Sequence, residues 1–256
     1  MHSPLTRTEK LFGVRLNAVT FEDAITLLSR QVNLRPAKVI VTPNVDHFVS
    51  LSENPALREI YASADFAFAD GMPVVWASRL LDQVLPERVT GADLFVAFCL
   101  LAQENSWRVN VLGGMPGQED MLLDRFSVVY PELQVKIRCP GMGFNPQSDE
   151  AKAAAEWINA TKPDLVFVCL GFPRQSLWSL GNRKKLDTGL VFCVGAAMEF
   201  ALGIKSRAPL WMQRRGLEWV WRLSSEPTKL WRRYLVRGPR FISLVLQEWR
   251  VKKPQS

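Results

Sequence analysis

Short apolar runs that end in small-residue turns recur along this chain, with helical patterns between them. Four runs lie at residues 39–41, 109–112, 165–170 and 190–194, and a fifth lies at residues 65–69. Alternation of buried strands with helices is typical of a parallel α/β sheet. Ligands of such sheets bind beyond the carboxyl ends of the strands. The pattern therefore predicts a site along one sheet edge, built from residues that follow the strands: Asn44, Asp70, Gly113, Gln175 and Gly195.

The same periodicity predicts the remaining elements. Additional strands are expected at 12–16 and 134–138. Helices are expected at 21–32 with Thr20 as N-cap, at 45–63 with a break at Asn54-Pro55, and at 74–81, 91–105, 117–129, 149–161 and 174–182. Beyond Gly195 only helical patterns remain, at 196–203, 209–223, 226–236 and 238–250. The chain is thus predicted to form an α/β domain, residues 1–204, and a helical appendage, residues 205–256.

Charge separates the same two parts. The chain carries a net charge of +7, and segment 205–253 holds 13 Lys and Arg against 3 Asp and Glu. That segment also holds five of the nine tryptophans. Three interpretations fit this composition: helices lying on an anionic membrane surface, a nucleic-acid-binding surface, or a packed aromatic stripe with arginine stems covering it.

The motifs argue against several classes of protein. The N-terminus lacks a signal pattern, and the apolar run at 94–102 is far shorter than the roughly 20 residues that span a bilayer, so a cytoplasmic protein is expected. No metal site is expected, because the chain has no closely spaced Cys or His cluster and no D-x-D pair. Its glycine turns match neither the dinucleotide nor the P-loop fingerprint, which disfavours a nucleotide-dependent oxidoreductase and predicts no cofactor.

Asp70 is the leading candidate for chemistry at the strand ends. A carboxylate there acts either as a helix N-cap or as a general base toward an attacking hydroxyl. Asn44 likewise either caps the next helix or holds a sugar hydroxyl. Arg88 is either a solvated surface residue or a partner for a diphosphate. His47 is interpreted as structural, because no G-x-S-x-G motif accompanies it.

Two glycine turns are candidate anion sites. Gly113-Gly114 and the turn at 171–175 each precede a predicted helix, whose free N–H groups favour anions. Any tight strand-to-helix turn also favours glycine, so a purely structural role stays open.

Taken together, these segments resemble the WecG/TagA/CpsF glycosyltransferases (glycosyltransferase family 26) over roughly residues 10–240. The matching segments occur in the family's order: 42–44, 69–75, 88–94, 113–114, 171–175 and 216–234. The resemblance implies a Rossmann-like parallel sheet flanked by helices, with a basic helical C-terminal appendage. It also implies an inverting, metal-independent transfer of a sugar from a UDP-sugar to an undecaprenyl-diphosphate-linked saccharide in cell-surface polysaccharide synthesis.

Further expectations follow from the resemblance. The donor sugar would be of the N-acetylmannosamine type, its uronic acid, or of the glucose type. The enzyme would sit peripherally on the inner face of the cell membrane, with its appendage on anionic lipid and no nucleic-acid partner. The aromatic tail also suggests a homo-oligomer. The alternative function is a basic peripheral module that binds membrane or nucleic acid without catalysis.

The resemblance also assigns roles by position. Asp70 corresponds to the catalytic base, while Thr42 and Asn44 correspond to contacts with the sugar or the acceptor. Arg88 and Gln175 correspond to contacts with the donor or its leaving group, whose diphosphate would lie near Gly113-Gly114 or Gly195.

In the appendage, Arg222 and Arg232 correspond to arginines over the acceptor diphosphate. Lys229 stands where the family commonly has arginine. It keeps the charge but loses the bidentate geometry of a guanidinium.

Overall fold

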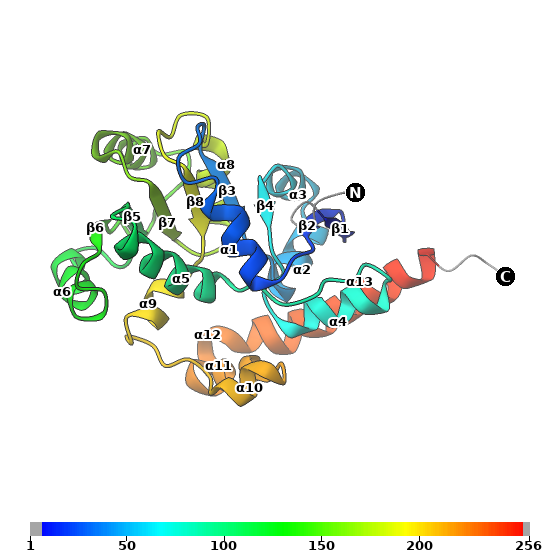
Figure 1. Cartoon of the computed structure of the whole chain (residues 1–256). Helices are drawn as coiled ribbons and strands as arrows, with labels where there is room; N and C mark the ends of the chain where they lie inside the picture. Colours follow the sequence, from blue (N-terminus) through cyan, green and yellow to red (C-terminus); the bar gives the residue numbers. More distant parts are fainter. Residues whose placement is uncertain (1–6, 253–256) are drawn as a thin grey trace.

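Six parallel strands form one sheet at the centre of the molecule, in the order β4-β3-β8-β7-β5-β6 (Figure 1). The computed structural model describes residues 7–252, apart from the side chains of Arg214, Lys229 and Arg233. The strands are β3 (Lys38–Val41), β4 (Phe66–Ala67), β5 (Arg108–Gly113), β6 (Gln134–Arg138), β7 (Leu165–Cys169) and β8 (Leu190–Cys193). The predicted parallel α/β sheet is confirmed.

Helices cover both faces of this sheet, because alternate strand residues are apolar on each side. One core packs sheet residues against α2 (Val45–Glu53), α3 (Pro55–Ala62), α4 (Met72–Leu80), α7 (Asp149–Thr161) and α8 (Arg174–Asn182). The other packs the opposite face against α1 (Phe21–Ser29), α5 (Gly91–Glu104), α6 (Glu119–Val129) and α9 (Ala197–Ala201). Thr20 caps α1 by accepting from the Asp23 N–H, as predicted, and Asn54-Pro55 separates α2 from α3.

The prediction of a single strand at 12–16 is wrong. The segment belongs to an antiparallel hairpin of β1 (Thr8–Leu11) and β2 (Val14–Asn17), and its turn is Phe12-Gly13. Both turn residues have positive φ, 48° and 83°, which suits a two-residue hairpin turn. Phe12 is held there by edge-on contacts with Phe48 and Phe241, at centroid distances of 5.3 and 5.4 Å. Core packing therefore overrides the local alternation.

The C-terminal helices gather beside the carboxyl ends of the strands (Figure 1). They are α10 (Leu210–Arg214), α11 (Glu218–Ser225), α12 (Pro227–Trp231), a π-helical turn (Arg232–Val236) and α13 (Arg237–Lys252). The continuous helix predicted at 209–223 is wrong, because Gly216 at φ 70° separates α10 from α11. The predicted break before residue 238 is also wrong. The helical run continues through the π turn, which ends three residues before Pro239. The missing N–H of a proline disturbs the hydrogen bonds of the preceding helical turn.

The last helix is joined to the body of the protein. α13 packs along α2 and buries Phe241 and Val245 in the first core. Arg237 of α13 also pairs with Asp46 of α2, with 2.6 Å between Nη1 and Oδ1. Part of the C-terminal segment thus contributes to the core of the α/β body.

Candidate active site

The strand-end residues meet as the parallel topology predicts. Thr42, Asn44, Asp70, Gln175 and Gly195 all line one cavity of about 290 Å³. They follow four neighbouring strands, β4, β3, β8 and β7, whose carboxyl ends share one edge of the sheet. The sequence-derived candidates at these four strands therefore face a common space.

Backbone hydrogen bonds hold Asp70 in place, and the residue lines the cavity. Its N–H donates to the Pro43 carbonyl at 2.9 Å, and the neighbouring Ala69 carbonyl accepts from Val89 at 2.9 Å. The N-cap position of α4 is Gly71, and no side chain caps that helix. The structural alternative for Asp70, a helix cap, is therefore wrong.

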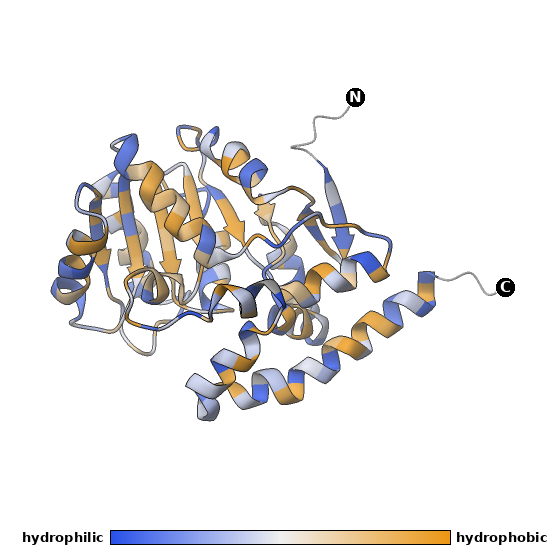
Figure 2. Cartoon of the chain, turned by 60° about the horizontal axis from the view of Figure 1, so that its bottom comes forward, coloured by the Kyte–Doolittle hydropathy of each residue, from blue (hydrophilic) through white to orange (hydrophobic). Residues whose placement is uncertain are grey.

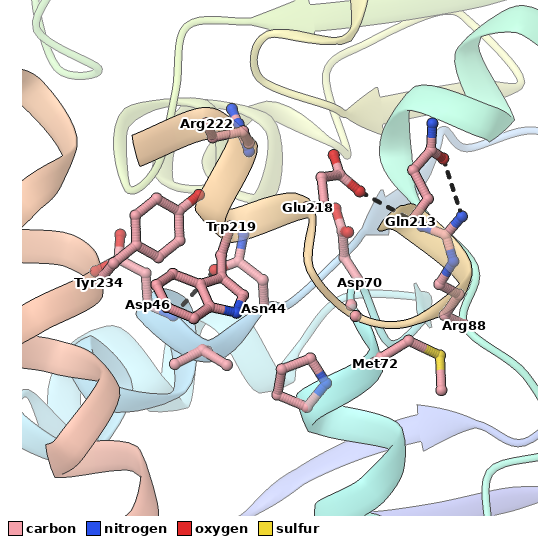
Figure 3. A pocket seen from close by; sticks show the side chains of 14 residues that line it. Asn44, Asp46, Asp70, Met72, Arg88, Gln213, Glu218, Trp219, Arg222 and Tyr234 are labelled. Atoms are coloured by element: carbon pink, nitrogen blue, oxygen red, sulfur yellow. Dashed lines mark hydrogen bonds and ion pairs between the residues drawn. The ribbon is translucent and has the colours of Figure 1, made fainter. Parts of the chain in front are cut away.

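A second, narrower cavity of about 110 Å³ is shown in Figure 3. It shares Asp70 with the first cavity, so the two meet there. The residues that line both cavities are Asn44, Asp46, Asp70, Glu218 and Arg222. Away from this junction the narrower cavity is lined by α4 and the appendage, through Met72, Pro73, Trp219 and Tyr234. Asp70 thus stands where a polar space at the strand ends opens toward a more apolar one.

The surroundings of Asp70 place its pKa close to neutrality. Burial is the main cause of a pKa raised from 3.8 to about 6, and the negative charge of Glu218 adds to it. Arg222 and Arg88 act in the opposite direction, while Asp93 raises the pKa further. A carboxylate with this pKa is ionised at pH 7 and still basic enough to accept a proton during a reaction.

Asn44 does serve as a helix cap. Its Oδ1 accepts from the N–H groups of Asp46 and His47, at 3.1 and 3.2 Å, at the start of α2. His47 is buried, its Nδ1 lies 3.1 Å from the Tyr61 hydroxyl, and its ring stacks on Phe172 with centroids 4.1 Å apart. Both side chains also border the larger cavity, so capping and ligand contact are compatible at Asn44.

Gln175 organises the Gly195 turn. The Gln175 side chain is buried, and its Oε1 accepts from the Gly195 N–H at 2.9 Å. The Gly195 N–H is therefore already paired within the protein. This contact ties the end of β8 to the first turn of α8, on the wall of the larger cavity.

Neither glycine of the predicted Gly113-Gly114 turn lines the larger cavity. A Cβ on Gly113 would come within 2.5 Å of the Cys169 Cβ, and one on Gly114 within 2.8 Å of the Cys139 Sγ. Close packing against neighbouring residues therefore explains the absence of side chains. Gly114 lines an adjoining hollow of about 210 Å³, which shares Gly171, Gly195 and Ala196 with the larger cavity.

Arg88 faces the appendage. Its Nη2 donates to the Gln213 Oε1 at 3.2 Å, and its Nη1 lies 3.7 Å from the Glu218 carboxylate (Figure 3). Gln213 in turn donates to the Ala208 carbonyl at 2.7 Å. Arg88 also borders the narrower cavity beside Asp70.

A second contact fastens the start of the appendage to the body. Arg207 donates to Asp93 of α5 at 2.6 Å, and Asp93 also accepts from Thr90 at 2.7 Å. Burial acts to raise the pKa of Asp93, but the hydrogen bond and charge of Arg207 outweigh it and leave that pKa below its usual value. The segment 88–93 is therefore held by three residues of the basic C-terminal part, Arg207, Gln213 and Glu218.

The three tail cations expected near a diphosphate lie in different surroundings. Arg222 borders both cavities, with its guanidinium 5.2 Å from the centre of the Phe200 ring. Arg232 lies outside both cavities, 5.3 Å over the Trp231 ring. The Lys229 side chain lies outside the described residues.

Sequence reasoning missed several residues of this site. Asp46, Glu218, Gln213, Trp219 and Tyr234 all border the cavities. Glu218 carried a usable signal, since it is one of three acidic residues in a segment with 13 basic ones and follows a Gly-Leu turn. Among residues 7–252, no group of three or more His, Cys, Asp or Glu is placed to hold a metal ion.

Comparison with known proteins identifies the family of this chain. A sequence profile described as the Glycosyl transferase WecG/TagA/CpsF family matches residues 9–255. The chain belongs to this glycosyltransferase family. Its fold and the order of its strand-end motifs agree with that membership.

Two bacterial members of the family show the degree of similarity. A Bacillus spizizenii protein is 29% identical over 211 residues, which cover 82% of this chain and 79% of the relative. A protein of Bacillus subtilis strain 168 is 27% identical over 240 residues, covering 94% and 90%. Both are N-acetylglucosaminyldiphosphoundecaprenol N-acetyl-beta-D-mannosaminyltransferases. The glycosyltransferase match spans the α/β body and the appendage together.

Proposed function

We propose that this glycosyltransferase moves a sugar from a UDP-sugar onto an undecaprenyl-diphosphate-linked saccharide, with inversion at the anomeric carbon. The half-buried Asp70 carboxylate carries this proposal, because it lies where the two cavities meet and caps no helix. The two Bacillus relatives act on such a lipid-linked acceptor, which supports the acceptor class. A role in bacterial cell-surface polysaccharide synthesis follows from that acceptor.

The chemistry requires one base and one stabiliser of negative charge. Asp70 accepts the proton of the acceptor hydroxyl while the acceptor oxygen forms its bond to the anomeric carbon. The bond from that carbon to the diphosphate breaks on the opposite face, which inverts the centre and releases UDP. Arg222 offsets the charge that develops on the leaving diphosphate, in a site partly shielded from water.

The two cavities suggest where each substrate binds. The larger one, with Thr42, Thr90 and Gln175 on its walls, offers polar groups suited to a nucleotide sugar. The narrower one leads past Met72, Trp219 and Tyr234, which suits the less polar, lipid-linked acceptor. A few side chains in the larger cavity would select among N-acetylmannosamine, its uronic acid and glucose.

The test is acceptor-dependent UDP release by the purified protein. A short-chain polyprenyl-diphosphate N-acetylglucosamine would be combined with a panel of UDP-sugars, with and without EDTA. We expect release with one donor, unchanged by EDTA, and a product of inverted anomeric configuration by NMR. UDP release that ignores the acceptor, or a retained configuration, would contradict the proposal.

We also propose a peripheral location on the cytoplasmic face of the membrane, and an apolar face beside the narrower cavity supports the peripheral attachment. Leu210 and Trp211 of α10 are 67% and 55% exposed, and Trp76 and Leu80, one turn apart on α4, are 47% and 53% exposed. Gly216 packs against Trp76, so α10, α11 and α4 adjoin. Figure 2 shows apolar and polar positions alternating along α13 on the neighbouring surface. Among residues 7–252, no helix is long and apolar enough to cross a membrane.

If the apolar face inserts into a membrane, replacing the Trp211 ring should strongly weaken membrane binding. Trp211→Asp should lower partitioning onto anionic phosphatidylglycerol vesicles by about tenfold or more, because inserting a large apolar side chain contributes about 1.5–3 kcal/mol. Vesicle sedimentation measures this partitioning. A point variant is preferable to truncation, since removing α13 would uncover the core around Phe241.

Val128→Asp is the matched control for Trp211→Asp. Val128 is 80% exposed on α6, away from α4 and the appendage in Figure 1. It should leave vesicle binding unchanged. Equal losses in both variants would show that the added charge, and not the position, determines binding.

A further inference from the structure

The appendage brings a second carboxylate to the catalytic base. Glu218 is the first residue of α11, and it borders both cavities together with Asp70. Figure 3 shows the Asp70 side chain pointing toward Glu218, which in turn contacts Arg88. Glu218 is acidic in a strongly basic segment, so the overall positive charge of the appendage does not explain its presence.

A close backbone contact sets the position of Glu218. Gly216 adopts φ 70°, and a Cβ on it would lie 2.6 Å from the Trp76 ring and 3.0 Å from the Met72 Cβ. Only glycine allows both the left-handed turn and this approach to α4. The turn ends α10 and starts α11 two residues later, over the strand end that bears Asp70.

Glu218 also acts on the backbone next to Asp70 through Arg88. The Arg88 side chain is only 17% exposed, and its guanidinium lies between Gln213, at 3.2 Å, and Glu218, at 3.7 Å. The next residue, Val89, donates to the carbonyl of Ala69, which directly precedes Asp70. Glu218 is therefore linked to the backbone of Asp70 through Arg88 and the hydrogen bond from Val89 to Ala69.

We propose that Glu218 is a positioning residue of the transfer reaction: it holds Arg88 against the strand end and sets a negative charge beside Asp70. The base is then complete only when the appendage is docked on the body. This inference rests on the proposed function of Asp70 as the base. It gives the appendage a part in proton transfer in addition to membrane attachment.

The charges around Asp70 determine the direction of the expected effect. The charged and titratable groups that interact with Asp70 are Glu218 and Arg222 of α11, Asp93 of α5, Tyr61 of α3, and Arg88 and Arg207 of the loops. Asp46 of α2 lines the same cavities as Asp70. After burial, Glu218 is the largest cause that raises the pKa of Asp70 to about 6. Removing its charge lowers that pKa, so the rate should persist to lower pH.

The experiment compares the pH profile of kcat/KM for wild type and Glu218→Gln, an isosteric change. We expect the acid limb, near pH 6 in wild type, to move down by about one pH unit, and the plateau rate to fall because the base is weaker. Glu218→Asp should restore most of the wild-type profile. An acid limb that stays in place in Glu218→Gln would overturn the inference.

Glu226→Gln is the matched control. It removes the same charge from the same appendage, but Glu226 lies 3.5 Å from Lys205 and borders neither cavity. Its pH profile should be that of wild type. A shift as large as that of Glu218→Gln would mean that total appendage charge is responsible, and would overturn a specific role of Glu218.

A measurement independent of turnover separates this inference from the proposed function. Carboxyl 13C NMR of aspartate-labelled protein follows the titration of Asp70 directly, assigned by Asp70→Asn. A lower Asp70 pKa in Glu218→Gln supports the coupling even if no UDP-sugar is turned over, in which case the proposed reaction alone fails. An unchanged Asp70 pKa overturns the coupling even in an active enzyme.

Discussion

Asp70→Asn is expected to lower kcat by about 10²–10⁴-fold while the protein keeps its fold. The amide has nearly the same shape but cannot accept the proton of the attacking hydroxyl. No loss of stability is expected from a missing cap, since the N-cap of α4 is Gly71 and no side chain caps that helix. Turnover of the acceptor, together with thermal unfolding of both proteins, measures the two effects.

Asp65→Asn is the matched control for this prediction. Asp65 also lies at β4, but its carboxylate accepts from the Val39 N–H at 2.9 Å and pairs with Lys38 at 3.4 Å. Its loss should lower the free energy of unfolding by about 1 kcal/mol and leave kcat near the wild-type value. If Asp70→Asn turned over substrate within a few-fold of wild type, Asp70 would not be the base.

Arg222→Gln is expected to lower kcat by about 10²–10³-fold, the usual result of removing one group that stabilises charge in a transition state. Arg222 borders both cavities, and the leaving diphosphate of the donor is proposed to bind in the larger one. Its charge also lowers the pKa of Asp70, so the acid limb of the profile should move to higher pH. The sign is opposite to that expected for Glu218→Gln.

Two variants make this prediction specific. Arg222→Lys keeps the charge but not the planar guanidinium, and should fall between wild type and Arg222→Gln. Arg215→Gln removes one charge from an exposed position of the same appendage and should leave kcat unchanged. Comparable losses in Arg215→Gln and Arg222→Gln would contradict a local role for Arg222.

The opposite signs expected for Glu218 and Arg222 follow from their common position. Both lie one helical turn apart on α11, and both border the cavity junction at Asp70. The contacts of Arg88 with Gln213 and Glu218, together with the Gly216 turn, dock α11 on the body. The docked helix holds one negative and one positive side chain at fixed positions around the Asp70 carboxylate. Docking of the appendage would thereby set the proton affinity of the site.

The sequence alone determined the elements whose signals are local. Strand and helix positions such as 134–138, 149–161 and 174–182 agree with the structure, because hydrophobic periodicity is a property of neighbouring residues. The N-caps at Thr20 and Asn44 are local for the same reason. The meeting of Asn44, Asp70, Gln175 and Gly195 at one cavity followed as well, since the carboxyl ends of parallel strands share one edge.

Only the tertiary structure decided which of these residues act together. The Asp70 carboxylate is free of a capping role because Gly71 is the N-cap of α4, and Gly113 faces Cys169 because β5 pairs with β7. Arg88 meets Gln213 and Glu218, more than a hundred residues away. Such contacts depend on strand order and on how the appendage docks, and no periodicity within a single element contains that information.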